Sequence, residues 1–211
     1  TPDPLKVQIP VIKELLTLTG IPTVELEGYE ADDLIGHITK RALELGFFVK
    51  IYTPDKDMLQ LVSDRVVCIN PITGEVFNRE KVIEKFGVSP ELIPSYLALV
   101  GDSSDNIEGI KGVGKKTAIK ILEKYKSLDN ILMNFEEFKR AFPEADREKL
   151  ELAYSLVKLQ PVPDLELREE DMELKKPDLG RLKAKLLELE MKSLLKDVDT
   201  LFGLPLFTKS K

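Results

Sequence analysis

An alternation of apolar and amphipathic segments near the start of the chain most constrains its fold. Residues 23–26 predict a short strand, residues 31–45 predict an amphipathic helix, and Gly46 ends that helix before the apolar segment 47–52. A strand, a helix and a second strand in this order are typical of a parallel α/β sheet. Ligand sites form at the carboxyl ends of such strands, and Asp55 comes directly after the second one.

Outside this segment the chain is expected to be mainly helical, apart from one hairpin. A helix is predicted over residues 5–19, and residues 66–77 predict a hairpin. From about Arg79 onward the pattern is helical, broken at glycines and prolines, and the last long helix is expected over residues 179–195. We therefore expect an α/β core followed by a helical region, with domains over residues 1–100 and 101–211.

Seven carboxylates fall into three tight clusters in the first half of the chain. So many anions in one site repel each other strongly unless divalent cations lie among them. The clusters therefore predict a catalytic site for two metal ions, and hard oxygen ligands suit Mg²⁺ or Mn²⁺ better than zinc. For any single cluster the alternative is a solvated face or a helix start. The seven residues are Glu30, Asp32, Asp33, Asp55, Asp57, Asp102 and Asp105.

The backbone around the first cluster decides which of its carboxylates can share an ion. Glu30 and Asp33 are three residues apart and lie on one face if the turn is helical, which directs Asp32 elsewhere. If the helix instead begins at Ala31, Glu30 is extended and all three carboxylates can converge. The sequence leaves both arrangements open.

The second cluster and the only histidine give simpler expectations. Asp55 and Asp57 are two residues apart, so in an extended backbone they face the same way and Lys56 points away. His37 has no second histidine to act with, which argues against nucleophilic triad chemistry. The chemistry is therefore expected to come from the acids.

A glycine-rich segment with clustered lysines follows the third acid cluster. It departs from the Walker A phosphate-binding pattern, because Lys116 stands where a Ser or Thr is required and no strand directly precedes it. A hairpin between two helices fits better, since its glycines let a DNA backbone approach and the second helix binds a phosphate through its N-terminal N–H groups. The alternative is a glycine-rich helical turn with solvated lysines. The expected DNA-binding residues are Gly109, Lys111, Gly112, Gly114, Lys115, Lys116, Thr117 and Lys120.

Composition limits the class and the compartment. The chain is 43% hydrophobic and contains no apolar run long enough to span a bilayer, so we expect no membrane contact. Its single cysteine, Cys68, cannot form an internal disulfide, which favours a reducing interior. The net charge of −6 argues against binding nucleic acid through overall charge, so local lysines would have to carry such binding.

Four ordered motifs resemble those of 5′ nucleases. They are GYEADD at 28–33, TPDKD at 53–57, GDSSDN at 101–106 and GIKGVGKKTA at 109–118. Over nearly all of its length the chain resembles the 5′-to-3′ exonuclease, or flap endonuclease, domain of bacterial DNA polymerase I. The resemblance implies a mainly parallel, PIN-like 5′-nuclease sheet with flanking helices. It also implies a helix-three-turn-helix motif, which grips duplex phosphates and often binds K⁺ through backbone carbonyls.

The resemblance also implies a function and partners. These are two-metal hydrolysis of DNA phosphodiesters in replication and repair, a substrate of branched or nicked duplex DNA with a 5′ single strand, and a polymerase domain in the same or another chain. The location implied is the bacterial cytoplasm, at the nucleoid. One Mg²⁺ would lie nearest Glu30, Asp32, Asp33 and Asp55, and the other nearest Asp57, Asp102 and Asp105. One ion would activate a water, both would stabilise the transition state, and the second would assist the leaving oxygen.

One departure from the family pattern leaves other functions open. Family members begin with a strand that carries another metal-binding Asp, followed by a second such Asp and an arch whose Lys and Arg residues contact the scissile phosphate, and this sequence starts after them. The chain is therefore expected either to act with those residues supplied elsewhere or to be a catalytically weak fragment that binds DNA junctions through residues 109–120. A PIN-like ribonuclease is a third hypothesis, against which the glycine hairpin argues.

Overall fold

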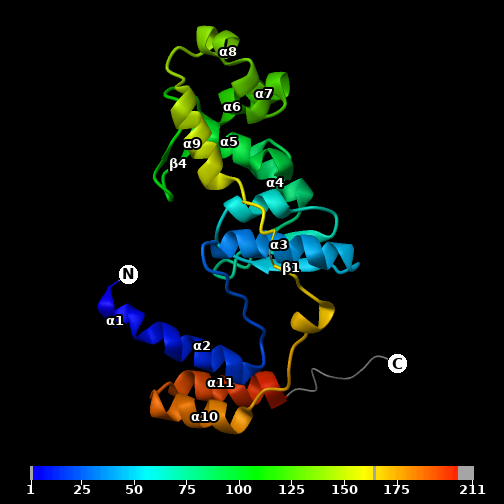
Figure 1. Cartoon of the computed structure of the whole chain (residues 1–211), viewed down its shortest axis with the longest axis vertical. Coiled ribbons are helices and arrows are strands. Elements are labelled where there is room, and N and C mark those ends of the chain that lie inside the picture. The colour runs from blue at the N-terminus through cyan, green and yellow to red at the C-terminus, as the bar shows by residue number, and fades with distance from the viewer. Residues whose placement is uncertain (1, 164, 204–211) are drawn as a thin grey trace. The chain divides into compact units, whose positions relative to one another are not determined.

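In the computed structural model, residues 2–163 and 165–203 are described, and the chain divides into two compact units (Figure 1). One unit is residues 26–165, and the other combines residues 1–25 with 166–211. Each unit has an apolar core of its own. The expected boundary at residue 100 follows a change of sequence pattern, whereas these units follow contacts, and that boundary stays a prediction. Within the described residues, no helix has the length and apolar character needed to cross a membrane.

The sheet of the 26–165 unit has three strands in the order β1-β2-β3. β1 (Val49–Tyr52) pairs in parallel with β2 (Val66–Ile69), with Val49 opposite Val66, and β2 pairs antiparallel with β3 (Val76–Phe77). The predicted strand after Gly46 and the predicted hairpin are thus confirmed. The sheet is parallel in only one of its two pairings, because the hairpin supplies the other.

Two helical elements flank β1 and carry functional side chains. The predicted helix from Ala31 is confirmed as α3 (Ala31–Glu44), which packs against β1 and η1. η1 (Asp57–Leu61) is a 3₁₀ helix that connects β1 to β2, and its Met58 and Leu59 are buried in the core. These apolar anchors fix the start of η1 directly beside the carboxyl end of β1.

The strand expected over residues 23–26 is wrong. Side chains there alternate between exposed and half-buried, as in a strand, but the segment has no strand assignment. The reason is the lack of a partner, because no described strand pairs with it. The parallel pair in this chain is therefore β1 and β2, joined through η1, and no strand enters α3.

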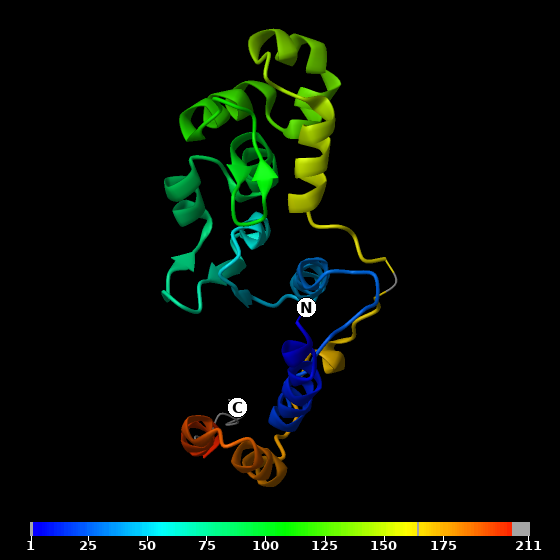
Figure 2. The same ribbon diagram turned by 90° about the vertical axis from the view of Figure 1, so that its left-hand side faces the viewer.

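The remainder of the 26–165 unit is helical, as predicted, apart from a short hairpin. α5 is buried along almost its whole length and packs against α6 and α9. Both views place α7 and α8 at one end of this unit (Figures 1 and 2). The elements are α4 (Arg79–Phe86), η2 (Pro90–Leu92), α5 (Ile93–Val100), β4 (Gly101–Asp102), β5 (Ile107–Glu108), α6 (Lys115–Tyr125), α7 (Leu128–Met133), α8 (Phe135–Ala141) and α9 (Arg147–Val157).

The second unit is a small helical cluster. α2 packs against α10 and α10 against α11, around Leu18, Leu182, Leu186 and Val198 (Figure 1). The predicted N-terminal helix is present but divided at Val7. Its elements are α1 (Asp3–Lys6), α2 (Gln8–Thr19), η3 (Glu169–Asp171), α10 (Leu179–Glu188) and α11 (Lys192–Gly203).

The single helix expected over residues 179–195 is wrong. α10 ends at Glu188 because Glu190 has a φ of 56°, in the left-handed region, which turns the chain. The N–H of Met191 then donates to the carbonyl of Leu186 at 2.9 Å, which closes the helix end before α11 begins. The periodicity of the leucines continues through the break, so the pattern alone did not mark it.

Candidate metal centre

The first acid cluster lies at the start of α3, and its backbone resolves the alternatives left by the sequence. Glu30 is extended, with φ −80° and ψ 157°, and the helix begins at Ala31. Asp32 and Asp33 therefore occupy the first turn, where the positive end of the helix dipole favours anions. All three carboxylates line one hollow of about 210 Å³, together with Asp57 and residues 155–160.

The second cluster lies in the tight turn between β1 and η1. The backbone N–H of Asp57 donates to Asp55 Oδ1 at 2.8 Å, and the N–H of Asp55 donates to Thr53 Oγ1 at 3.0 Å. Lys56 has helical angles, with φ −76° and ψ −20°, so the backbone is not extended as expected. The turn buries Asp57 at the head of η1 and leaves Asp55 half-buried.

The third cluster lies in the hairpin between β4 and β5. Asp102 is the last residue of β4, is 2% exposed, and pairs in the ladder with Ile107. Its Oδ1 accepts the N–H of Ser104 at 2.9 Å, which holds the carboxylate in place, while Asp105 is exposed at the hairpin turn. The hairpin needs Gly101, since a Cβ there would lie 2.6 Å from the nitrogen of Gly109.

The three clusters meet around Asp57. Carboxylate oxygens of Asp57, Asp102 and Asp105 all lie within 4.8 Å of one another. Burial and the neighbouring carboxylates, Asp55 first, raise the pKa of Asp57 to about 7. Burial and Asp55 also raise the pKa of Asp32, which connects the first cluster to the other two.

A lysine completes this acidic centre, so the expectation that Lys56 points away is wrong. Its ammonium donates to Asp102 Oδ1 and to Ser104 Oγ, the latter at 3.1 Å. Burial of Asp102 acts to raise its pKa, but the bonds from Lys56 and Ser104 outweigh burial and hold that pKa below its usual value. Lys56 turns inward because its backbone is helical rather than extended.

The donor set fits divalent cations. Asp57 Oδ1 and Asp102 Oδ2 are buried and have no hydrogen-bond partner among the described residues. An unpaired buried carboxylate oxygen is costly, and a divalent cation satisfies it without a proton. Lys56 supplies one positive charge against a centre of several carboxylates, so the remaining negative charge also favours a divalent ion.

The glycines of the predicted DNA-binding hairpin have different structural roles. A Cβ on Gly109 would lie 2.2 Å from the carbonyl carbon of Val100, so close backbone packing requires this glycine. Gly112 has a φ of 83° and open space around it, and Gly114 also has open space. Only the last two glycines therefore leave room for an external backbone to approach.

The lysines of this segment lie in the hairpin itself and in the first two turns of α6. No side chain caps α6, whose N-cap is Gly114. Four lysines are exposed and Thr117 is half-buried. One of the four, Lys115, donates to the carbonyl of Lys85 at the end of α4. The other three exposed lysines are Lys111, Lys116 and Lys120.

Sequence reasoning missed the polar residues that hold the acids. Lys56 and Ser104 lie inside motifs already singled out, but nothing local indicated that they would contact each other. Gln60 and Gln160 lie outside the sequence motifs, and each forms hydrogen bonds across more than ninety residues of chain. A polar residue one turn beyond Asp57, on an otherwise apolar helix, was the only signal for Gln60.

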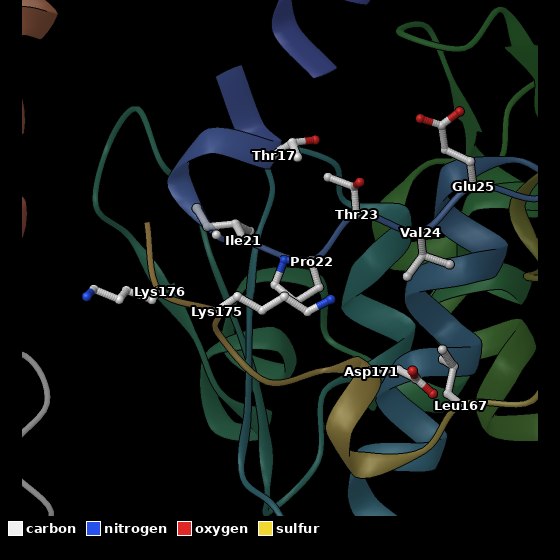
Figure 3. Close-up of a pocket in the computed structure, with 11 residues that line it drawn as sticks. Thr17, Ile21, Pro22, Thr23, Val24, Glu25, Leu167, Asp171, Lys175 and Lys176 are labelled. Carbon is white, nitrogen blue, oxygen red and sulfur yellow. The ribbon is translucent and has the colours of Figure 1, made fainter. Parts of the chain in front are cut away.

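A second hollow, of about 560 Å³, lies in the other unit (Figure 3). It is lined by the end of α2, the segment that follows it and residues around η3. Lys175 lies beneath Pro22, and Lys176 points away from it. Asp171 is paired with Arg168 at 3.1 Å. The charged side chains that line this hollow point apart or are already ion-paired. They do not converge on one point, as the groups of a reaction centre would.

A sheet edge with converging carboxylates, followed by helices that carry a glycine-rich turn with lysines, defines a class of metal-dependent nucleases. A family model described as "5′-3′ exonuclease, N-terminal resolvase-like domain" matches residues 1–87, and "5′-3′ exonuclease, C-terminal SAM fold" matches residues 88–180. A 5′-3′ exonuclease from Aquifex aeolicus is 63% identical over 201 residues, covering 95% of this chain and 70% of that protein. The chain belongs to the 5′-3′ exonuclease family.

Longer and more distant relatives are consistent with membership of this family. The thermostable DNA polymerase I of Thermus aquaticus is 40% identical over 207 residues, covering 97% of this chain, and the chain spans 24% of its length. The flap endonuclease of bacteriophage T5, in a pseudo-enzyme-product complex with DNA and metal ions, is 25% identical with a TM-score of 0.60, over 75% of this chain and 62% of that one. The resemblance to the exonuclease domain of polymerase I is confirmed, as is the order of an α/β part and a helical part.

Proposed function

We propose that this chain is a structure-specific 5′ nuclease that hydrolyses DNA phosphodiesters beside the junction of a duplex and a 5′ single strand, in replication and repair. The observation that carries the proposal is the meeting of three acid clusters around Asp57 in a member of the 5′-3′ exonuclease family. A substrate of branched or nicked DNA is supported by the flap endonuclease complex with DNA. A polymerase domain, in the same or another chain, is a partner that the polymerase I relatives support.

We assign two divalent ions, Mg²⁺ or Mn²⁺, to this centre. When bound, such ions supply a hydroxide nucleophile and neutralise charge on the phosphate. Asp57 and Asp102 would hold their ion through the oxygens that lack another partner. Lys56 would keep Asp102 ionised and oriented. The first ion would lie toward Glu30, Asp32 and Asp55, and the second toward Asp57, Asp102 and Asp105.

We assign duplex binding to α5, the turn at residues 109–114 and α6, as a helix-three-turn-helix. Uncapped N–H groups at the start of α6 would take one phosphate, and the exposed lysines would add charge. Gly112 and Gly114 leave open space for the DNA backbone. A K⁺ ion at the carbonyls of this turn is part of the same proposal. Contacts of this kind bind phosphate and shape without reading base sequence.

The test is cleavage of a labelled 5′-flap DNA by the purified chain, with Mg²⁺, Ca²⁺ or EDTA. We expect cleavage near the junction only with Mg²⁺, and Asp102→Asn should slow it by about 10²–10³-fold, because several kcal/mol of transition-state stabilisation depends on such a centre. Binding of the flap in Ca²⁺ should persist in the variant. Asp64→Asn, at an exposed aspartate outside the three clusters, is the matched control.

Three other outcomes are informative. Tight flap binding without Mg²⁺-dependent cleavage would favour a catalytically weak fragment that binds DNA junctions. Cleavage of RNA in preference to flap DNA would favour the ribonuclease hypothesis. Wild-type rates in Asp102→Asn would mean that the hairpin carboxylates have only a structural role.

A further inference from the structure

One backbone segment touches two of the acid-bearing elements. This segment, residues 158–160, follows the end of α9 at Val157, and we call it the strap. Its last residue, Gln160, donates its backbone N–H to Asp33 Oδ1 at 2.7 Å. The strap is therefore tied to the first turn of α3, next to Asp32.

Gln60 ties the same strap to η1, which begins with Asp57. Its Nε2 donates to the carbonyl of Asp57 and to the carbonyl of Val157, both at 2.8 Å. Its Oε1 accepts the N–H of Leu159 at 3.3 Å. The side chain of Gln60 is therefore hydrogen-bonded to the last turn of α9, to the strap and to Asp57, the first residue of η1.

Packing supports the hydrogen bonds. Leu159 lies over Gly36, one turn beyond Asp33 on α3, and a Cβ at Gly36 would lie 3.0 Å from Leu159 Cδ1. Glycine inside a helix costs roughly 1 kcal/mol relative to alanine, so its presence needs a reason. Close approach of the strap to α3 supplies that reason.

The strap holds together elements that their charges push apart. Asp32 at the start of α3 and Asp55 beside η1 repel each other, and the repulsion is part of what raises the pKa of Asp32. The strap lines the hollow into which Glu30, Asp32, Asp33 and Asp57 face. Its bonds to α3 and η1 therefore oppose separation of the two acid-bearing elements.

Asp33 differs from the other acids in its contacts. Its Oδ1 accepts a backbone N–H from Gln160, 127 positions away, whereas Asp55 and Asp102 accept backbone N–H groups from only two positions away. We propose that Asp33 and Gln60 are positioning residues that clamp the strap and thereby set the separation of Asp32 and Asp57, and that Asp33 is not a metal ligand. This inference rests on the proposed metal centre, because positioning requires ligands to position.

The discriminating pair of variants is Asp33→Asn and Asp33→Ala. Asparagine keeps an oxygen that accepts the Gln160 N–H but removes the charge, whereas alanine removes both. The readout is Mn²⁺ affinity by electron paramagnetic resonance. We expect Asp33→Ala to weaken binding about 10–100-fold, as loss of a residue that orients ligands does, and Asp33→Asn to weaken it by less than about fivefold. Equal losses in both variants would make Asp33 a ligand and overturn the proposal.

Gln60→Met provides an independent test, because it keeps the volume of the side chain and removes all three hydrogen bonds. We expect about the same loss of Mn²⁺ affinity as in Asp33→Ala. Asp64→Ala, at an exposed aspartate outside the clusters, controls for loss of charge, and circular dichroism of every variant controls for folding. Unchanged Mn²⁺ affinity in a folded Gln60→Met would also overturn the proposal.

Hydrogen exchange separates failure of this inference from failure of the proposed function. In the wild type the amides of Leu159 and Gln160 should exchange slowly, Asp33→Ala should accelerate exchange at Gln160, and Asp33→Asn should not. Fast exchange of both amides in the wild type would show that the strap is not clamped, even if the protein binds Mn²⁺. If the wild type shows the clamp but binds no Mn²⁺, the metal centre itself is wrong, and with it the positioning role.

Discussion

At the scale of single residues, Asp57 carries the carboxyl group whose ionisation is most disfavoured by its surroundings. It is 9% exposed, it lies among other carboxylates, and its pKa is raised to about 7. Its pKa in the unfolded chain is about 3.8. The metal-free folded protein therefore keeps a proton that the unfolded chain releases between these values. Stability from this group is present below pH 4 and is lost as the pH rises toward 7.

We therefore expect Asp57→Asn to stabilise the metal-free protein increasingly as the pH rises from 5 to 8. The reason is that asparagine removes the cost of ionising a buried carboxylate. Thermal unfolding in EDTA across this range measures it, with Asp64→Asn as the control. A difference in melting temperature that does not change with pH would contradict the raised pKa. Adding Mg²⁺ to the wild type at pH 8 should recover the lost stability, because a bound cation favours the ionised form.

Lys56 is the residue that neutralises the buried carboxylate of Asp102. Lys56→Met should destabilise the metal-free protein by about 1–3 kcal/mol, because a buried carboxylate oxygen loses its donor. Mg²⁺ should restore more stability to this variant than to the wild type, since the cation replaces the lost charge. Urea unfolding with and without Mg²⁺ measures both effects, and Lys50→Met on the exposed side of β1 is the control. A loss that Mg²⁺ leaves unchanged would mean that Lys56 acts only through packing.

At the scale of elements, the start of α6 separates lysines that are otherwise alike in sequence. Lys116 is exposed, whereas Lys115 already donates to the carbonyl of Lys85. Lys115 thus ties α6 to the end of α4, where a Cβ on Gly87 would overlap Ile119 of α6 at 2.3 Å. The two helices are therefore held closely, and the outward charge lies on the neighbouring lysine.

We expect Lys116→Ala to reduce the magnitude of the log–log salt slope for duplex binding by about one, because one phosphate contact and its released counterions are lost. Lys115→Ala should reduce the slope by less and lower the melting temperature more. Fluorescence anisotropy over a salt series, on two duplexes of unrelated sequence, gives both slopes. Equal slopes for Lys116→Ala and the wild type would place the duplex on another surface.

At the scale of the whole molecule, the two compact units have separate cores. Leu182 is 3% exposed in the core of one unit, and Phe138 is fully buried in the core of the other, beside Tyr125 and Phe142. The core residues around Leu182 all lie within residues 1–25 and 166–211, and those around Phe138 all lie within residues 26–165. Damage to one core should therefore remain in its own unit.

Leu182→Ala should destabilise its unit by about 2–5 kcal/mol and leave Mn²⁺ affinity unchanged, because every acid of the metal centre belongs to the other unit. Phe138→Ala should cost about 3–5 kcal/mol in the 26–165 unit. Hydrogen exchange measured by peptide shows which unit loosens in each variant. Faster exchange throughout both units in Leu182→Ala would show that they unfold together.

The sequence by itself determined the local elements and the composition of the site. Periodicity was sufficient for α3, β1 and the β2–β3 hairpin, because each is specified by side chains within a few positions of one another. It failed where the deciding contact is distant: the segment 23–26 lacks a strand to pair with, and a positive φ at Glu190 divides the last helix. The motifs also identified the family.

Only the tertiary structure decided how the acids are held. Lys56 meets Asp102 across 46 positions, and Gln60 meets Val157 across 97. Contacts of that range depend on how η1, the β4–β5 hairpin and the strap pack, and a pattern of neighbouring residues carries no information on such packing. The acids could be recognised from the sequence because their charge identifies them. The lysine and glutamine that position them could not, because each acquires its role only when the chain has folded.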